Sequence, residues 1–149
     1  MTEKSRELRD ARQGDLEAIY EIEKLSFSDP YPKNLLKSFL FFPGAYIVVL
    51  EGGRLVGYAI GVIRHTTLGH VISIAIAPGN RRSGIGQELL GELVKKLGQC
   101  GAKEITLEVR ESNAAAISLY TKMGFGIGRE IKRYYPDGET ALEMNLSLK

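Results

Sequence analysis

The chain has 149 residues, of which 44% are hydrophobic and 26% charged, and its formal net charge is +2. This length and composition are those of one folded domain and exclude disordered and fibrous proteins. The 20 basic and 18 acidic residues are too balanced for a nucleic-acid surface, and no apolar run approaches the ~20 residues of a membrane span. We therefore expect one domain over residues 1–149, with no nucleic-acid and no membrane partner.

Three local features bear on where the protein is located and on whether it contains a disulfide or a metal site. The polar start, MTEKSRELRD, is not a secretory signal, so we expect a cytoplasmic protein. A single cysteine, Cys100, excludes an intramolecular disulfide and is interpreted as a half-buried structural thiol. His65 and His70 lack the spacing of zinc ligands, and we expect no metal.

The first half of the chain predicts two helices and four strands. After Asp15, a helix N-cap, a mainly helical apolar stripe follows, made of Leu16, Ile19, Tyr20, Ile22, Glu23 and Leu25. Pro30 and Pro32 prevent a continuous helix and separate the first helix from the second. Glu51-Gly52-Gly53 marks a hairpin turn. The expected elements are helices from Leu16 to Leu25 and from about Lys33 to Phe41, and strands at 6–12, 45–50, 54–63 and 69–77.

The second half predicts two more helices and three strands. Residues 84–99 are amphipathic with one leucine-rich face, and 103–110 (KEITLEVR) alternate as in a half-buried strand. A helix over 114–122 is capped by Ser112 or Asn113 and stopped by Gly124. Strands over 125–135 and 139–148 close as a hairpin around Pro136-Asp137-Gly138. The order of the elements predicts an α+β sheet protein with seven strands, four helices and a central βαβ unit.

The segment from Ile74 to Leu90 (IAIAPGNRRSGIGQELL) predicts a phosphate-binding site. A buried strand leads through a turn and two arginines into Gly84-Ile85-Gly86 and a helix. A helix start presents free N–H groups, and glycine lets phosphate approach them. The P-loop and dinucleotide patterns do not fit, since Ile85-Gly86 and Leu89 stand where they need other residues. The alternative is that Gly84 and Gly86 merely shape a strand–helix turn.

The run from Arg81 to Gly86 resembles the (Gln/Arg)-x-x-Gly-x-(Gly/Ala) signature of the GNAT superfamily of N-acetyltransferases. The resemblance implies that the loop and helix start bind the pyrophosphate of acetyl-CoA, with no metal, and that the preceding strand pairs with the pantetheine arm. It also implies a single central mixed, mostly antiparallel sheet. The cofactor-binding residues that it implies are Ile74, Ala75, Ile76, Arg81, Arg82, Ser83, Gly84, Ile85, Gly86, Gln87, Asn113 and Tyr120.

Two further segments resemble one subgroup. The run from Leu107 to Tyr120, followed by Gly124-Phe125, looks like the RimI-like ribosomal-protein-alanine acetyltransferases and the archaeal N-terminal acetyltransferases. The run from Arg133 to Glu139 resembles their substrate-side hairpin. The resemblance implies acetyl transfer to the N-terminal α-amino group of proteins or peptides, with ribosomal proteins and broader nascent chains as candidate substrates and a monomer or weak homodimer as the working form.

By the same resemblance, Glu108 is the candidate general base, acting through water, and Tyr120 protonates or hydrogen-bonds the departing sulfur. Asp29 stands where archaeal relatives have a catalytic glutamate, and His70 stands at the start of the fourth strand, as in those relatives. These two are secondary candidates. Each also has a plain interpretation: Glu108 as a solvated carboxylate, Tyr120 as core, Asn113 as a helix cap and His70 as a surface side chain.

The substrate side is expected between the loop joining the first two helices and the last hairpin. The expected substrate-binding residues are Phe27, Tyr31, Tyr134 and Tyr135. Two other functions stay open: acetylation of a small-molecule amine, and a non-catalytic acetyl-CoA sensor or assembly subunit. The paired aromatic residues Tyr134 and Tyr135 favour an extended peptide over a small molecule, and the presence of Glu108 and Tyr120 counts against a sensor.

Overall fold

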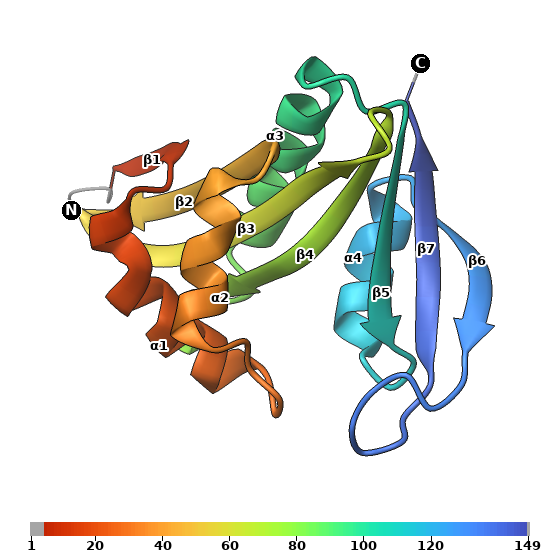
Figure 1. Ribbon diagram of the computed structural model, residues 1–149. Helices are drawn as coiled ribbons and strands as arrows, with labels where there is room; N and C mark the ends of the chain where they lie inside the picture. The colour runs from red at the N-terminus through yellow and green to blue at the C-terminus, as the bar shows by residue number, and fades with distance from the viewer. Residues whose placement is uncertain (1–4, 149) are drawn as a thin grey trace.

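The computed structural model describes residues 5–148, which are organised around one seven-stranded sheet. Helices α1 and α2 cover one face of this sheet, and α3 and α4 cover the other (Figure 1). The strands are β1 (Arg6–Asp10), β2 (Gly44–Glu51), β3 (Arg54–Arg64), β4 (Leu68–Ile76), β5 (Glu104–Arg110), β6 (Gly126–Ile131) and β7 (Ala141–Ser147). The helices are α1 (Leu16–Ser26), α2 (Lys33–Ser38), α3 (Ile85–Gln99) and α4 (Ala114–Lys122).

The strand order is β1-β2-β3-β4-β5-β7-β6. Every neighbouring pair is antiparallel except β4 and β5, which are parallel. A parallel pair needs a crossover connection, and α3 supplies it, so the predicted βαβ unit is β4–α3–β5. The expected mixed, mostly antiparallel sheet with four helices is confirmed.

The pairing of β4 with β5 is short. It runs from Leu68 opposite Glu104 to His70 opposite Thr106 and then stops, although β4 remains paired with β3 as far as Ile76. The two strands then diverge, as Figure 1 shows. The β3–β4 register also shifts, with Ile60 opposite Ser73 and Gly61 opposite Val71, so that Ile72 is an extra, bulged residue in β4.

Two hydrophobic clusters fix the helices to the sheet. Leu89, Leu90, Leu93 and Leu97 of α3 are fully buried against one face, as the amphipathic pattern of 84–99 predicts. The other cluster joins α1 and α2 to β2 and β3, and its fully buried members include Ile19, Leu36, Tyr58 and Ile60. Ile105, Leu107 and Val109 belong to the α3 cluster, so the alternate residues of β5, Glu108 among them, face the α1–α2 side.

Three expectations need correction. The second helix ends at Ser38 and continues as a 3-10 turn over Phe39–Phe41. The last two strands are shorter than expected, because residues 132–140 form a loop in which Arg133 has a left-handed φ of 56° that a strand does not accommodate. The thiol of Cys100 is exposed rather than half-buried.

Within residues 5–148, no helix is long and apolar enough to span a membrane. Residues 1–4, the beginning of the polar N-terminal stretch, and residue 149 lie outside the described residues.

Candidate functional site

The structure brings His70 and Glu108 together at the point where β4 and β5 separate. His70 Nε2 lies 2.7 Å from Glu108 Oε1, and the two side chains are 15% and 16% exposed. The contact follows from the register, because His70 is opposite Thr106 and Glu108 is two residues further along the same face of β5. When Nε2–H donates to the carboxylate, Nδ1 remains as a proton acceptor. The pair can therefore accept a proton at the point where β4 and β5 separate.

The loop between β4 and α3 has the geometry expected of a phosphate cradle. Gly84, the N-cap of α3, has a left-handed φ of 83°, and a Cβ placed on it would meet no heavy atom within 4 Å. No side chain caps this helix start, so its first N–H groups are left for a ligand or water at the positive end of the helix dipole. Ile85 of the same turn is buried and anchors the helix.

The two arginines of this loop are placed differently. Arg81 donates from Nε to the Ile76 carbonyl at 3.0 Å and from Nη2 to Ser26 Oγ at 3.2 Å, so it braces the loop against the ends of β4 and α1. Arg82 is exposed and has a left-handed φ of 64°. Ser83 Oγ donates to the Asn80 carbonyl at 2.6 Å. Both arginines and Gln87 are exposed, but Arg81 is held by two hydrogen bonds that brace the loop.

We call the point where β4 and β5 separate the fork. From the fork to this loop, the edge of β4 that faces β5 is unpaired. Ile74, Ala75 and Ile76 are paired with β3 on one side and, beyond His70, have no β5 partner on the other. An open strand edge presents backbone N–H and C=O groups to an extended ligand. A pantetheine arm, which carries two amide groups, is such a ligand, so the residues of this strand fit the group that the sequence implies.

Helix α4 lies on the α3 side of the fork. Asn113 caps it, with Oδ1 accepting the Ala116 N–H at 3.2 Å, as the plain interpretation expects. Tyr120 is 8% exposed and packs against Phe125 at a ring distance of 5.9 Å. Burial raises the pKa of Tyr120 to about 12, so its hydroxyl keeps its proton at neutral pH.

Three predicted substrate-side tyrosines lie on the α1–α2 side of the fork. Burial, and then the negative charges of Glu23 and Glu108, raise the pKa of Tyr31. Burial and then Glu108 raise the pKa of Tyr134. The Tyr134 and Tyr135 rings pack edge to face at 4.9 Å. A phenol with a pKa of about 10 or above keeps its proton at neutral pH, so Tyr31 and Tyr134 are hydrogen-bond donors in the negative field of Glu108.

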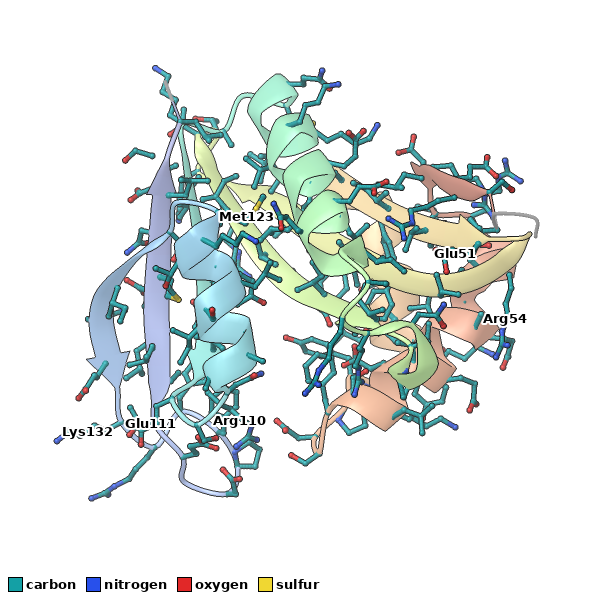
Figure 2. The ribbon with its side chains drawn as sticks, turned by 180° about the vertical axis from the view of Figure 1, so that it is seen from behind. Glu51, Arg54, Arg110, Glu111, Met123 and Lys132 are labelled. Carbon is teal, nitrogen blue, oxygen red and sulfur yellow. The ribbon has the colours of Figure 1, made fainter. Side chains whose placement is uncertain are left out.

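Arg110, labelled at the end of β5 in Figure 2, joins the two loops that carry these tyrosines. Its Nη2 lies 3.0 Å from Asp29 Oδ1 in the loop between α1 and α2. Its Nη1 lies 2.9 Å from Asp137 Oδ2 and 2.8 Å from Glu139 Oε1 in the loop between β6 and β7. The guanidinium also stacks on the Tyr135 ring at 4.1 Å. Arg110 therefore clamps the two loops together at the end of β5.

The ion pair with Arg110 fixes the position of the Asp29 side chain. Its carboxylate binds Arg110 and accepts from Ser28 Oγ at 3.2 Å, whereas His70 and Glu108 bind each other. Phe27, the other predicted residue of this region, ends α1 and is 37% exposed. Sequence reasoning assigned no role to Arg110, Asp137 or Glu139. All three lie inside the two segments that carry the subgroup resemblance, but nothing in their spacing shows that they meet.

No group of three or more His, Cys, Asp or Glu side chains within residues 5–148 is arranged to hold a metal ion. The site consists of a proton-accepting pair where β4 and β5 diverge, a tyrosine-lined face beside it, and an open strand edge that leads from the pair to a phosphate cradle.

The chain matches known proteins in sequence and in fold. The model of the acetyltransferase (GNAT) family matches residues 16–125. The chain belongs to this family. It is 37% identical to the N-alpha-acetyltransferase of Sulfurisphaera tokodaii over 92% of the chain and 90% of that protein, and 34% identical to the [ribosomal protein bS18]-alanine N-acetyltransferase of Escherichia coli strain K12 over 90% and 92%. The crystal structure of Ard1 from Thermoplasma volcanium superimposes with a TM-score of 0.92 and 26% identity, covering 97% of this chain and 98% of that one. The predicted GNAT resemblance is confirmed.

The clamp makes a prediction about pH. Hydrogen bonds from Ser112 and Arg110 lower the pKa of Glu139 from 4.5 to about 2. A lowered carboxyl pKa stabilises the fold above the ordinary pKa and loses that contribution as pH falls through the lowered one. We expect Glu139→Gln to reduce the free energy of unfolding at pH 7, and the reduction to shrink between about pH 4.5 and about pH 2.

Carbon-detected NMR titration of the Glu139 carboxyl measures the pKa directly. In Arg110→Gln the midpoint should move upward toward the ordinary value, because one of the two donors is gone. An identical midpoint in the wild type and in Arg110→Gln would contradict the clamp.

Proposed function

We propose that this GNAT-family protein transfers the acetyl group of acetyl-CoA to the free α-amino group at the N-terminus of a protein or peptide. The observation that carries the proposal is the His70–Glu108 contact, 2.7 Å long, at the point where β4 and β5 diverge. It sets a proton acceptor beside the open edge of the expected cofactor strand and on the same face as the tyrosines. The names of the relatives from S. tokodaii and E. coli support the same reaction.

The residues present fit acetyl-CoA. The open edge of Ile74–Ile76 would hold the pantetheine arm, and Arg82, Ser83 and the N–H groups of Gly84–Gln87 would hold the pyrophosphate. Arg81 would keep the loop in shape through its bond to the Ile76 carbonyl. Asn113 would fix the start of α4 beside the arm. When bound, acetyl-CoA supplies an activated acetyl thioester.

Residues of the chain itself accept the proton that the substrate amine must lose. An α-amino group has a pKa of about 8 and a lysine of about 10.4, so roughly 250 times more of the α-amine is free at neutral pH. The His70–Glu108 pair accepts the remaining proton, through one water where the amine is out of direct reach. Glu108 carries the charge, and its contact with Nε2 orients the imidazole. Asp29 serves here as the attachment of the α1–α2 loop to Arg110.

On the other face of the sheet, Tyr120 would hold the leaving group of acetyl-CoA. A phenol with a pKa of about 12 is a much weaker acid than a thiol, whose ordinary pKa is about 8.5. Full proton transfer to the sulfur would therefore be uphill. Tyr120 would therefore act as a hydrogen-bond donor that stabilises the departing thiolate.

The substrate lies between the α1–α2 and β6–β7 loops. Tyr31 and Tyr134 offer phenol donors to its backbone, Tyr135 supports Tyr134 edge to face, and the exposed ring of Phe27 offers an apolar contact. Such donors on two facing loops suit an extended chain better than a compact small molecule. Ribosomal proteins and nascent chains in the cytoplasm are the candidate substrates.

The proposal is tested by a thiol-release assay with acetyl-CoA and short peptides that begin with serine, alanine, Met-Leu or Met-Glu. Each peptide is paired with an N-blocked version that contains a lysine. We expect release with free N-termini and little with blocked ones, because the α-amine is the more easily deprotonated nucleophile. Equal release from the blocked lysine peptides, or no release from any peptide despite acetyl-CoA binding, would overturn the proposal.

The catalytic pair makes its own prediction. Glu108→Gln should lower kcat by about 10²-fold, as expected when a general base is lost, and leave acetyl-CoA affinity unchanged. Since His70 and Glu108 act as one unit, His70→Ala combined with Glu108→Gln should be no slower than the slower single variant. Glu104→Gln, at the exposed start of the same strand, is the matched control. Wild-type turnover in Glu108→Gln would remove the pair from the mechanism.

A further inference from the structure

A second carboxylate near the site, that of Glu23, is buried and has no role in the reaction proposed above. Glu23 lies in the last turns of α1, and 1% of its surface is exposed. It lies on the helix face that carries Ile19 and Ile22 into the core. Removing a carboxylate from water is strongly unfavourable unless hydrogen bonds replace its hydration. The hydrogen-bond partners of Glu23 therefore indicate the role of this buried carboxylate.

Three donors from three different parts of the fold satisfy the two oxygens. The Tyr58 hydroxyl, on β3, donates to Oε1, and so does Ser73 Oγ, on β4, at 3.0 Å. The two hydroxyls lie 3.2 Å from each other. Oε2 accepts the backbone N–H of Tyr31, in the loop between α1 and α2, at 3.0 Å. All three partners are neutral, so the bonds hold Glu23 by geometry rather than by charge pairing.

These partners connect two surfaces that the reaction needs at a fixed separation. Ser73 directly follows the bulged Ile72 and directly precedes Ile74, where the expected cofactor strand begins. Tyr31 carries one of the phenols that lie in the field of Glu108. Glu23 thus spans from the bulge of β4 to the backbone of the substrate loop. The loop's other attachment is Asp29 on Arg110, at its outer side.

We propose that Glu23 is a positioning residue that fixes the α1–α2 loop, through the Tyr31 N–H, at a set distance from Ser73 and the strand edge that would hold the arm of acetyl-CoA. The inference rests on the proposed function for its kinetic consequence, and on the structure alone for the anchor. It goes beyond a stabilising role, because apolar residues of similar volume often stabilise a core at least as well as buried charged groups. An apolar residue cannot accept the N–H of Tyr31.

The chain offers variants that separate anchoring from folding. In Glu23→Leu/Tyr58→Phe/Ser73→Ala the network becomes apolar and the Tyr31 N–H loses its acceptor. Glu23→Gln is the conservative variant: its amide oxygen can still accept from Tyr31, and its NH₂ can donate to the hydroxyls of Tyr58 and Ser73, which can turn to accept. Leu97→Ala, in the α3 cluster on the other face, is a control for general loss of stability.

Two readouts are measured: the hydrogen-exchange rate of the Tyr31 amide by NMR, and the KM values for acetyl-CoA and for the best peptide of the release assay. In the triple variant we expect Tyr31 exchange and the peptide KM to rise about tenfold, the effect of losing a hydrogen bond to a charged group, with the acetyl-CoA KM unchanged. Glu23→Gln should stay within about threefold of the wild type in both readouts. Leu97→Ala should change neither the exchange rate of the Tyr31 amide nor the peptide KM.

Unchanged Tyr31 exchange in the triple variant would overturn the anchor, and faster exchange with an unchanged peptide KM would overturn its role in positioning. A Glu23→Gln variant as impaired as the triple variant would also overturn the proposal. If the triple variant does not fold, Glu23→Asp applies the same test, since an acid one methylene shorter cannot reach both Tyr58 and Tyr31. Failure of the wild type to acetylate any peptide would refute the proposed function, while the exchange rate would still decide whether the anchor exists.

Discussion

The pairing of β4 with β5 stops after His70, and most of the site follows from that early end. A sheet that stayed paired would bury the backbone groups of Val71–Ile76 in ladder hydrogen bonds and leave no edge for a ligand. Because the strands diverge, β4 keeps an edge free that leads directly to the start of α3, where the N–H groups are also free. The same divergence places His70 and Glu108 at its vertex, with helices α1 and α2 on one side and α3 and α4 on the other (Figure 1).

The face that receives the substrate is made of loops, and loops need attachments to hold a geometry. Arg110 supplies one attachment at the surface by binding Asp29, Asp137 and Glu139 with a single guanidinium. Exposed ion pairs contribute little one at a time, but a single group shared between two loops restricts both. Glu23 supplies the buried attachment through Tyr31. The α1–α2 loop is thus held at the surface by Arg110 and in the interior by Glu23, which binds the backbone of Tyr31.

The sequence was sufficient for the periodic parts of the fold and for the cofactor loop. The α3 leucines, the alternation of 103–110 and the glycines near 84 depend on local spacing, and all lie where that spacing predicts. Residues that meet through the tertiary fold were not predictable. The His70–Glu108 contact joins residues 38 positions apart, and the bond of Arg110 to Asp29 joins residues 81 apart. Glu23 did leave a signal, as an acid within an apolar helical stripe, but its three partners are visible only in the structure.

The central claim is that the edge of β4 freed by the divergence is the binding surface for acetyl-CoA. Amide hydrogen exchange of β4, measured with and without acetyl-CoA, tests this directly. The account predicts slower exchange for those amides of Val71–Ile76 that do not bond to β3, and no change for Leu68–His70, which already pair with β5. Saturating acetyl-CoA that leaves the exchange of Val71–Ile76 unchanged would contradict it.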